Sequence, residues 1–303
     1  MKNRNLLGTA QLLLAAFIWG SAFVAQSKGM DHVGPLTFAS VRFLIGGIIL
    51  IPIILIKNRS LKKKDESVFP KKADLGYTVL CGLFCGILLT VASVLQQYGL
   101  LYTTVGKSGF ITTLYVIFVP IFGLFMKKKA GANLWIAVII AVVGLYLLCM
   151  TEGLTLSGGD TLVFCCALAF TAQIVAVDVF VKRIDPILLS SMQFLTVGIV
   201  SGIPALIFET TSFSDLLSAA LPILYAGVLS SGVAFTLQVV AQKYTEPTIA
   251  AITMSFESVF AALSGWVILN ETLTLREGVG CAVMFSAIIL AQLPPSIFKL
   301  KKS

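Results

Sequence analysis

Ten apolar runs, each about 20 residues long, follow one another along this chain. A helix of that length spans the hydrocarbon core of a bilayer, where a backbone without internal hydrogen bonds is too costly. The two-residue alternation of a membrane β-barrel is not seen in the sequence. The sequence therefore predicts an all-α membrane protein with ten transmembrane helices, at about residues 6–27, 34–56, 77–100, 102–126, 132–150, 159–181, 187–208, 218–241, 246–269 and 276–296.

Composition and charge distribution favour a membrane protein over a nucleic-acid-binding one. Charged residues make up 12% of the chain, about half of what a soluble domain carries. The net charge of +8 arises because 18 of the 22 Lys and Arg residues lie in segments that the predicted spans place on one side. Basic loops mark the cytoplasmic side. We therefore expect both termini in the cytoplasm, the cell (inner or plasma) membrane as the location, and the lipid bilayer rather than nucleic acid as the partner.

Residues that bind metals are few and scattered. The six cysteines lie inside apolar segments without a CxxC spacing, and the single histidine, His32, lies between two spans. Structural zinc sites need four such ligands at short spacings, and the sequence has no P-loop for ATP. We therefore expect no metal, no cofactor and no enzymatic activity.

The chain contains an internal repeat. A shift of 151 residues gives eight identities between the first two spans and the sixth and seventh, including a proline at the start of spans two and seven. Further along, a shift of 142 residues superposes Gln96 on Gln238. Each half, residues 1–150 and 151–303, holds five predicted spans. Because five is odd, the halves must cross the membrane in opposite directions, and such inverted repeats enclose a substrate site near the bilayer midplane.

Several short motifs follow one another in both halves, namely Trp19-Gly20-Ser21, Pro35, Arg42-Phe43, Gln96-Gln97-Tyr98-Gly99-Leu100, Ser108-Gly109-Phe110-Ile111, Val119-Pro120, Ser255-Phe256-Glu257-Ser258, Gly265-Trp266 and Asn270-Glu271-Thr272. In order and spacing, over essentially the whole chain, they resemble the EamA family of the drug/metabolite transporter superfamily. The resemblance implies two inverted EamA-like five-helix repeats around a central cavity, lined mainly by helices 1, 3, 4, 6, 8 and 9. Family members move amino acids, nucleotide-like metabolites or toxic organic compounds, often outward.

One position departs from the family pattern. Where many relatives have Glu-Pro in the ninth helix, this chain has Glu257-Ser258. Proline is a common cause of helix kinks. Its loss removes one cause of a kink, so the family's geometry for the ninth helix is not carried over to this chain.

Three ionisable residues, Arg42, Lys107 and Glu257, lie inside predicted spans. Each costs roughly 2.5–3.5 kcal/mol on insertion scales, and such residues usually serve a pathway or an ion pair. Glu257 is a candidate to bind an amine or take up a proton, or else a structural hydrogen-bonded carboxyl. Arg42 is a candidate to pair with a carboxylate, of the substrate or of Glu257, or else reaches outward to the membrane surface. Lys107 either forms an electropositive outer vestibule with Arg42 or reaches outward as well.

Neutral polar and aromatic residues complete the candidate substrate site. Amides can hydrogen-bond a solute without the desolvation cost of a charge, or they can link helices. Aromatic rings can stack on a solute, or they can simply pack. The candidates to line the cavity with Glu257 are Trp19, Gln96, Thr112, Tyr115, Gln173 and Gln238.

These patterns favour a secondary transporter, an exporter of small metabolites such as amino acids or related organic compounds, that works by alternating access. Its partner would be a small-molecule substrate, with protons as a candidate coupling ion. One alternative is a membrane-embedded enzyme acting on a lipid substrate, which would need clustered His, Asp or Glu. The other is a membrane scaffold, which has no need of an inverted duplication.

Overall fold

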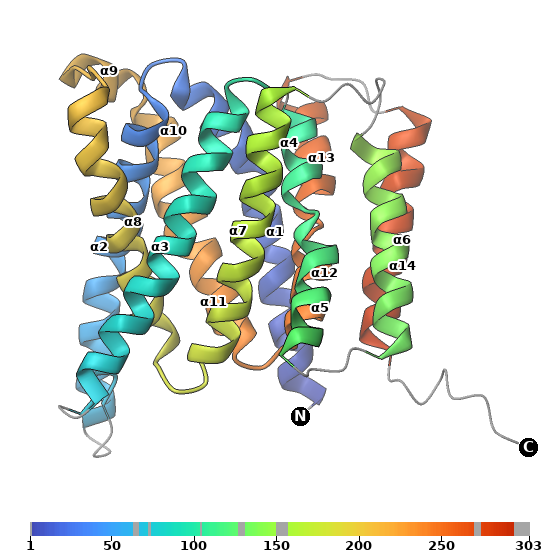
Figure 1. The fold of residues 1–303 in the computed structure, drawn as a ribbon, viewed down its shortest axis with the longest axis horizontal. Helices are drawn as coiled ribbons and strands as arrows, with labels where there is room; N and C mark the ends of the chain where they lie inside the picture. The colour runs from blue at the N-terminus through green and yellow to red at the C-terminus, as the bar shows by residue number, and fades with distance from the viewer. Residues whose placement is uncertain are drawn as a thin grey trace, which may run out of the picture.

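A computed structural model describes residues 2–62, 67–71, 74–103, 105–126, 131–149, 157–269 and 274–293. Within these ranges the chain forms helices and no strand, and Figure 1 shows the helices standing side by side. Eight of the described segments are long and apolar enough to cross a membrane, and Ala132–Leu147 is a shorter apolar helix. The predicted fold class, an all-α membrane protein, is confirmed.

Each predicted span coincides with one or more helical segments. Spans one to five are α1 (Lys2–Met30), α2 (Pro35–Lys62), α3 (Leu75–Leu100), α4 (Val105–Thr112) followed by α5 (Tyr115–Phe125), and α6 (Ala132–Cys149). Spans six to ten are α7 (Gly158–Phe180), α8 (Pro186–Phe208), α10 (Ala220–Leu224) followed by η2 (Tyr225–Phe235) and α11 (Thr236–Gln242), α12 (Pro247–Met254) followed by α13 (Glu257–Leu269), and α14 (Leu275–Gln292). The short helix α9 (Phe213–Ser218) links spans seven and eight.

The helices alternate in direction, so that α1 begins and α14 ends at the same end of the bundle, which we call the inner end (Figure 1). The opposite end, where α9 lies, is called the outer end. One edge of the bundle is formed by α2 packed on α8, and the other by α6 packed on α14. Between these edges, α1 contacts η2, α11, α12 and α13, so the first helix lies near the middle of the bundle.

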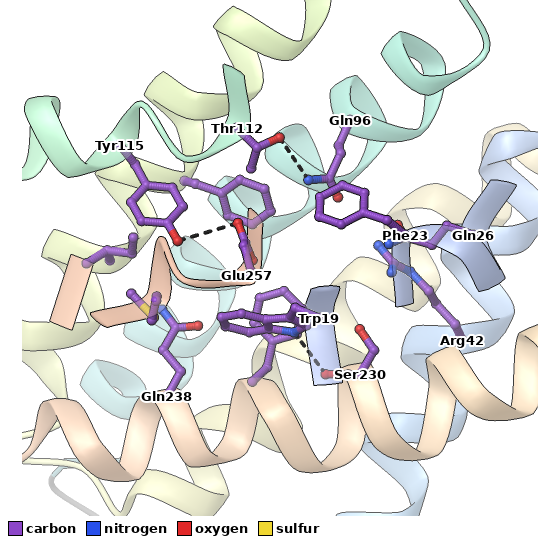
Figure 2. Close-up of a pocket in the computed structure, with 14 residues that line it drawn as sticks. Trp19, Phe23, Gln26, Arg42, Gln96, Thr112, Tyr115, Ser230, Gln238 and Glu257 are labelled. Carbon is purple, nitrogen blue, oxygen red and sulfur yellow. Dashed lines mark hydrogen bonds between the residues drawn. The ribbon is translucent and has the colours of Figure 1, made fainter. Parts of the chain in front are cut away.

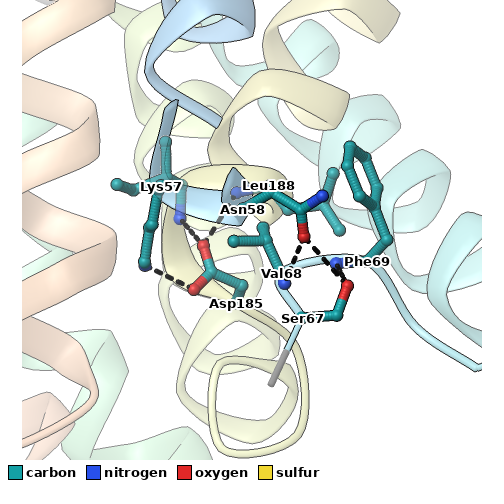
Figure 3. Close-up of polar contacts among 8 residues, drawn as sticks. Lys57, Asn58, Ser67, Val68, Phe69, Asp185 and Leu188 are labelled. Atoms are coloured by element: carbon teal, nitrogen blue, oxygen red, sulfur yellow. Dashed lines mark hydrogen bonds and ion pairs between the residues drawn. The ribbon is translucent and has the colours of Figure 1, made fainter. Parts of the chain in front are cut away.

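Two carboxylates hold α2 against α8, one at each end of the pair. At the outer end, the backbone N–H groups of Leu36 and Thr37 donate to the two oxygens of Glu209, both at 2.8 Å. At the inner end, Lys57 Nζ lies 2.5 Å from Asp185 Oδ2 (Figure 3). Asp185 also accepts from the first turn of its own helix, α8. Each carboxylate thus satisfies N–H groups that a helix start leaves free.

Spans four and nine are each interrupted near the middle, between α4 and α5 and between α12 and α13. At both breaks a hydroxyl competes for backbone carbonyls: Thr113 Oγ1 donates to Gly109 O (3.0 Å) and Ser255 Oγ donates to Ile252 O (2.8 Å). The backbone also tightens there to bonds between residues three apart, such as Phe256 N to Thr253 O. The ninth span is therefore interrupted even though residue 258 is a serine and not a proline.

Span eight is also not the single regular helix that its apolar pattern predicts. Its central part, η2, is a π-helix of 11 residues. This form is rare in proteins, and where it occurs it often lies at a functional site. Small residues of η2 let α2 approach closely: a Cβ added at Gly46 would lie 2.8 Å from Ser231 Cβ and 3.1 Å from Gly232 N. The widened helix therefore packs against α2 backbone to backbone.

Candidate functional site: a central cavity between the two repeats

A cavity lies in the middle of the bundle (Figure 2). The volume open to the centres of water molecules is about 40 Å³, which is room for a few waters at most. Helices 1, 3, 4, 6, 8 and 9 of the predicted ten line it, as the family resemblance implied, and α2 adds one residue. The lining residues are Trp19, Phe23, Gln26, Arg42, Gln96, Thr112, Tyr115, Phe170, Ile174, Ser230, Phe235, Gln238, Met254 and Glu257.

Most of the residues predicted for the site do lie at this cavity, and these are Trp19, Arg42, Gln96, Thr112, Tyr115, Gln238 and Glu257. Gln173 does not line it: this fully buried side chain lies behind Gln238 and accepts a hydrogen bond from it at 3.4 Å. Lys107 belongs to α4, but its side chain is outside the described part of the chain. The outer vestibule proposed for Lys107 with Arg42 stays a prediction.

The lining residues come in pairs related by the internal repeat. The shifts of 151 and 142 residues that align the two halves also connect ten of the fourteen lining residues with one another. The cavity is therefore built from equivalent faces of two oppositely oriented units, and this explains its place at the centre of the bundle. The pairs are Trp19 with Phe170, Phe23 with Ile174, Gln96 with Gln238, Thr112 with Met254, and Tyr115 with Glu257.

Tyr115 and Glu257 are equivalent in a further way. Tyr115 is the first residue of α5 and Glu257 the first residue of α13, so both follow the break in their span. Their side chains meet in the cavity, where the Tyr115 hydroxyl lies 3.5 Å from Glu257 Oε1 (Figure 2). Glu257 is 5% exposed, and a helix start favours a carboxylate through its free N–H groups and dipole. The break in span nine thus places the carboxyl at the cavity.

Arg42 breaks the symmetry of the cavity, since its repeat equivalent is the neutral Gln193. Its side chain is 2% exposed, and the guanidinium carbon lies 4.7 Å from the ring centre of Phe43. Among the described residues, no carboxylate pairs with it and its Nε has no hydrogen-bond partner. The predicted pairing with Glu257 is thus not made in this conformation, and the head group does not reach the surface. A buried cation without a partner is costly, so a substrate carboxylate remains the open alternative.

The neutral polar residues hold the cavity wall together. Gln96 Nε2 donates to Thr112 Oγ1 at 3.2 Å, which links α3 to α4. Trp19 Nε1 donates to the carbonyl of Ser230 in η2 at 3.3 Å, and its ring lies edge-on to Phe235 with ring centres 4.7 Å apart. These side chains therefore have interhelical partners as well as a surface toward the cavity.

Sequence reasoning missed some of the lining residues. The repeat would have identified Phe170 and Met254, because they are equivalent to the predicted residues Trp19 and Thr112. Gln26 follows Trp19 by seven residues, which is two helical turns on the same face. Ser230 and Phe235 gave no such signal, because they lie in the π-helix, where the regular spacing of a helix face does not apply.

Within the described ranges, no group of three His, Cys, Asp or Glu side chains is close enough to hold a metal ion. The chemistry that the cavity offers is instead recognition: a carboxyl, a guanidinium, amides and aromatic rings around a small space.

Comparison with known proteins decides the family. The model of the EamA-like transporter family matches residues 6–150 and 157–293. The chain belongs to this family. An uncharacterized transporter of Archaeoglobus fulgidus is 31% identical to this EamA-like chain over 291 residues, covering 96% of it and 87% of the relative. The Escherichia coli K12 protein YedA, named an uncharacterized inner membrane transporter, is 26% identical over 99% of this chain and 96% of its own.

A solved crystal structure shares the fold of this EamA-like chain, with a TM-score of 0.78 at 16% identity, over 97% of this chain and 99% of the other. The family match, the relatives and the apolar helices together identify an integral membrane protein that acts as a membrane transporter.

Proposed function

We propose that this EamA-like protein is a secondary transporter that exports small metabolites such as amino acids or related organic compounds by alternating access. One observation carries the substrate class: the central cavity presents the carboxyl of Glu257 and the guanidinium of Arg42 on different sides (Figure 2). Within the described residues neither has an oppositely charged partner. An amino acid carries both complementary charges, and Arg binds a carboxylate with two parallel hydrogen bonds.

Alternating access is supported by the size and symmetry of the cavity. A space of about 40 Å³ holds a few waters, so an amino acid fits only if the walls move apart. The walls are equivalent faces of two inverted units, for which we propose the boundaries 1–150 and 151–303. If the two units exchange conformations, a cavity open to one side becomes a cavity open to the other.

The proposed orientation follows from the basic residues. Arg59 and Lys71 lie in or near the loop after α2, and Lys182, Arg183 and Lys243 lie where α7 and α11 end, all at the inner end of the bundle. By the positive-inside rule the inner end faces the cytoplasm. Both termini would then be cytoplasmic. We propose the cell (inner) membrane as the location, since the relative YedA is named an inner membrane transporter.

Protons are the coupling ion that best suits the cavity. Glu257 is its one carboxyl among the described lining residues. If the carboxyl exchanges a proton for the amine of the substrate, inward proton flow drives export. Glu257 would then serve both substrate and ion, in the way that ionisable residues inside membrane spans often do.

The test is transport by the purified protein in liposomes. Amino acids are first screened as ligands that raise its melting temperature, because a binder stabilises by mass action. Those that do are assayed for saturable uptake and for exchange of labelled for unlabelled solute across the membrane. A proton gradient imposed in either direction then shows coupling and its sign.

Saturable exchange that a proton gradient accelerates would support the proposal. Flux without saturation would indicate a channel instead. The absence of flux for every solute that binds would contradict the proposal and favour the alternatives, a membrane-embedded enzyme acting on a lipid substrate or a membrane scaffold.

A further inference from the structure

Four buried glutamines form a continuous chain of hydrogen bonds in the inner half of the bundle. Gln173 Nε2 in α7 donates to Gln193 Oε1 in α8 at 3.0 Å. Gln238 Nε2 in α11 lies 3.4 Å from Gln173 Oε1 and also 3.4 Å from Gln242 Oε1. Gln242 Nε2 then donates to the carbonyl of Ile174, back in α7, at 3.0 Å. All four side chains are at most 2% exposed. We call them the glutamine chain.

The glutamine chain lies between two open spaces. Gln238 lines the central cavity, and Gln242, one helical turn nearer the inner end, lines a second pocket that opens at the inner end. Both spaces are bounded by the same two helices: Ile174 and Gln238 face the cavity, while Val175 and Gln242 face the inner pocket. The hydrogen bond from Gln242 to Ile174 O therefore crosses the seam between α7 and α11, along which the two spaces would join.

The outer half has no equivalent of this chain. Under the repeat, Gln173, Gln193 and Gln242 correspond to Ala22, Arg42 and Leu100, and only Gln238 has an amide counterpart, Gln96. Instead, apolar packing of Phe23, Leu100 and Ala261 fills the outer side. The two seams that the repeat makes equivalent are thus closed differently. Four linked amides lie at the inner seam, whereas apolar side chains and a single amide contact, from Gln97 Nε2 to Met30 Sδ, lie at the outer one.

We propose that the glutamine chain is the inner gate of the transport pathway, an inference that rests on the proposed carrier function. Opening the inner side requires α11 to move away from α7, which breaks these bonds in a dry region. A buried amide that loses its partner bears the desolvation cost until water or solute replaces it. The gate therefore stays closed until water from the inner pocket reaches these amides. The strength of their hydrogen bonds sets the fraction of protein molecules that are open to the cytoplasm.

The test measures access to the cavity from the inner side and needs no substrate. The reporter is Ser230→Cys, placed in a chain whose six cysteines are replaced by alanine. Ser230 lines the cavity and its hydroxyl has no described hydrogen-bond partner, so the change is conservative. The probe is a membrane-impermeant, positively charged methanethiosulfonate, applied to vesicles from the cytoplasmic side and, separately, from the other side.

The gate variant is Gln242→Ala, and the matched control is Gln97→Ala. Gln97 is an equally buried amide, in α3, but it lies outside the chain and its Nε2 has only Met30 Sδ at 3.4 Å as a described partner. Gln242→Ala removes two hydrogen bonds, the one from Gln238 and the one to Ile174 O. Because each net hydrogen bond is worth about a tenfold factor at most, we expect the loss of both to raise the cytoplasmic labelling rate by about tenfold or more. Gln97→Ala should leave it within about twofold, since it removes no bond of the gate.

Equal cytoplasmic labelling of the two variants would overturn the gate. If Gln242→Ala fails to fold, as judged by size-exclusion chromatography and melting, Gln193→Ala removes one bond at the far end of the chain and is read by the same comparison. Failure of the gate is distinct from failure of the carrier. If Gln242→Ala raises the labelling rate but the protein moves no solute in liposomes, only the carrier function is refuted. If the protein moves solute but Gln242→Ala does not raise the labelling rate, only the gate is refuted.

Discussion

The packing of α1 on α13 predicts a large effect from a single methyl group at Gly20. A Cβ added there would lie 2.6 Å from the carbonyl oxygen of Glu257, 2.6 Å from Phe260 Cβ and 2.7 Å from Ala261 N. Two of these atoms belong to the helix backbone and cannot rotate away. Gly20→Ala therefore forces α1 to move off α13 next to the cavity.

The magnitude follows from these distances. Atoms in contact prefer about 3.5 Å or more, so the helices must separate by roughly 0.8–0.9 Å at this point. Overpacking of this kind costs about 1–3 kcal/mol, and three simultaneous contacts favour the upper part of that range. The higher helix propensity of alanine returns about 1 kcal/mol at most. We expect a net loss of about 2 kcal/mol in the free energy of unfolding.

The assay compares two glycines that differ only in what surrounds them. Gly76, in α3, has no other described atom within 4 Å of an added Cβ, so Gly76→Ala should be neutral or slightly stabilising. Both variants are purified in the same detergent, and their unfolding is followed by circular dichroism against added denaturing detergent. A Gly20→Ala protein as stable as the Gly76→Ala protein would refute the packing argument. If the stability falls as expected, flux in liposomes should fall further, because the displaced carbonyl belongs to Glu257.

The remaining predictions concern the carboxylates. Glu257→Gln should reduce transport to background and leave expression unchanged, and any residual flux should lose its dependence on the proton gradient; full activity would exclude the carboxyl from the mechanism. Glu209→Ala removes both acceptors at the start of α2 and should lower the melting temperature by an amount that corresponds to about 1–2 kcal/mol; no change would mean that water satisfies this helix start equally well. Lys57→Met removes the partly exposed pair with Asp185 and should cost about 1 kcal/mol or less; since screening acts on the pair, the difference from the unmodified protein should shrink in high salt, and a constant difference would contradict an ionic origin.

The helical architecture could be predicted because the length and hydrophobicity of each span are enough to require a helix there. An apolar run of sufficient length must be helical in lipid whatever surrounds it, so the positions of the spans follow from local sequence alone. The interruptions could not be predicted in this way. At the breaks in spans four and nine, Thr113 and Ser255 bond to carbonyls within their own turns, whereas Thr171 makes the same kind of bond inside the unbroken α7. Which hydroxyl interrupts its helix depends on the neighbours that pack against it.

The candidate site could be predicted at positions where a polar side chain lies inside a span and the internal repeat relates it to another such position. Glu257, Gln96 and Gln238 are conspicuous because polar side chains are expensive inside spans, and the repeat relates the two amides. Gln173 is equally conspicuous but lies behind the cavity wall, bonded to Gln193 and Gln238. From the sequence, an amide that faces a solute and one that links helices are identical, since both need a hydrogen-bond partner.

The sequence by itself determined that this chain crosses the membrane as helices, that it is built from two inverted halves, and that a few costly polar groups lie inside. Hydrophobicity and duplication are properties of the chain and need no coordinates. Only the tertiary structure decided that Tyr115 and Glu257 meet in one cavity while Arg42 stays unpaired, and that Gln173 and Gln242 close a seam instead of facing the cavity. The reason is physical: side chains far apart in sequence find partners through the rotation of each helix about its axis and the points where helices break, and these are fixed by packing among all the helices at once.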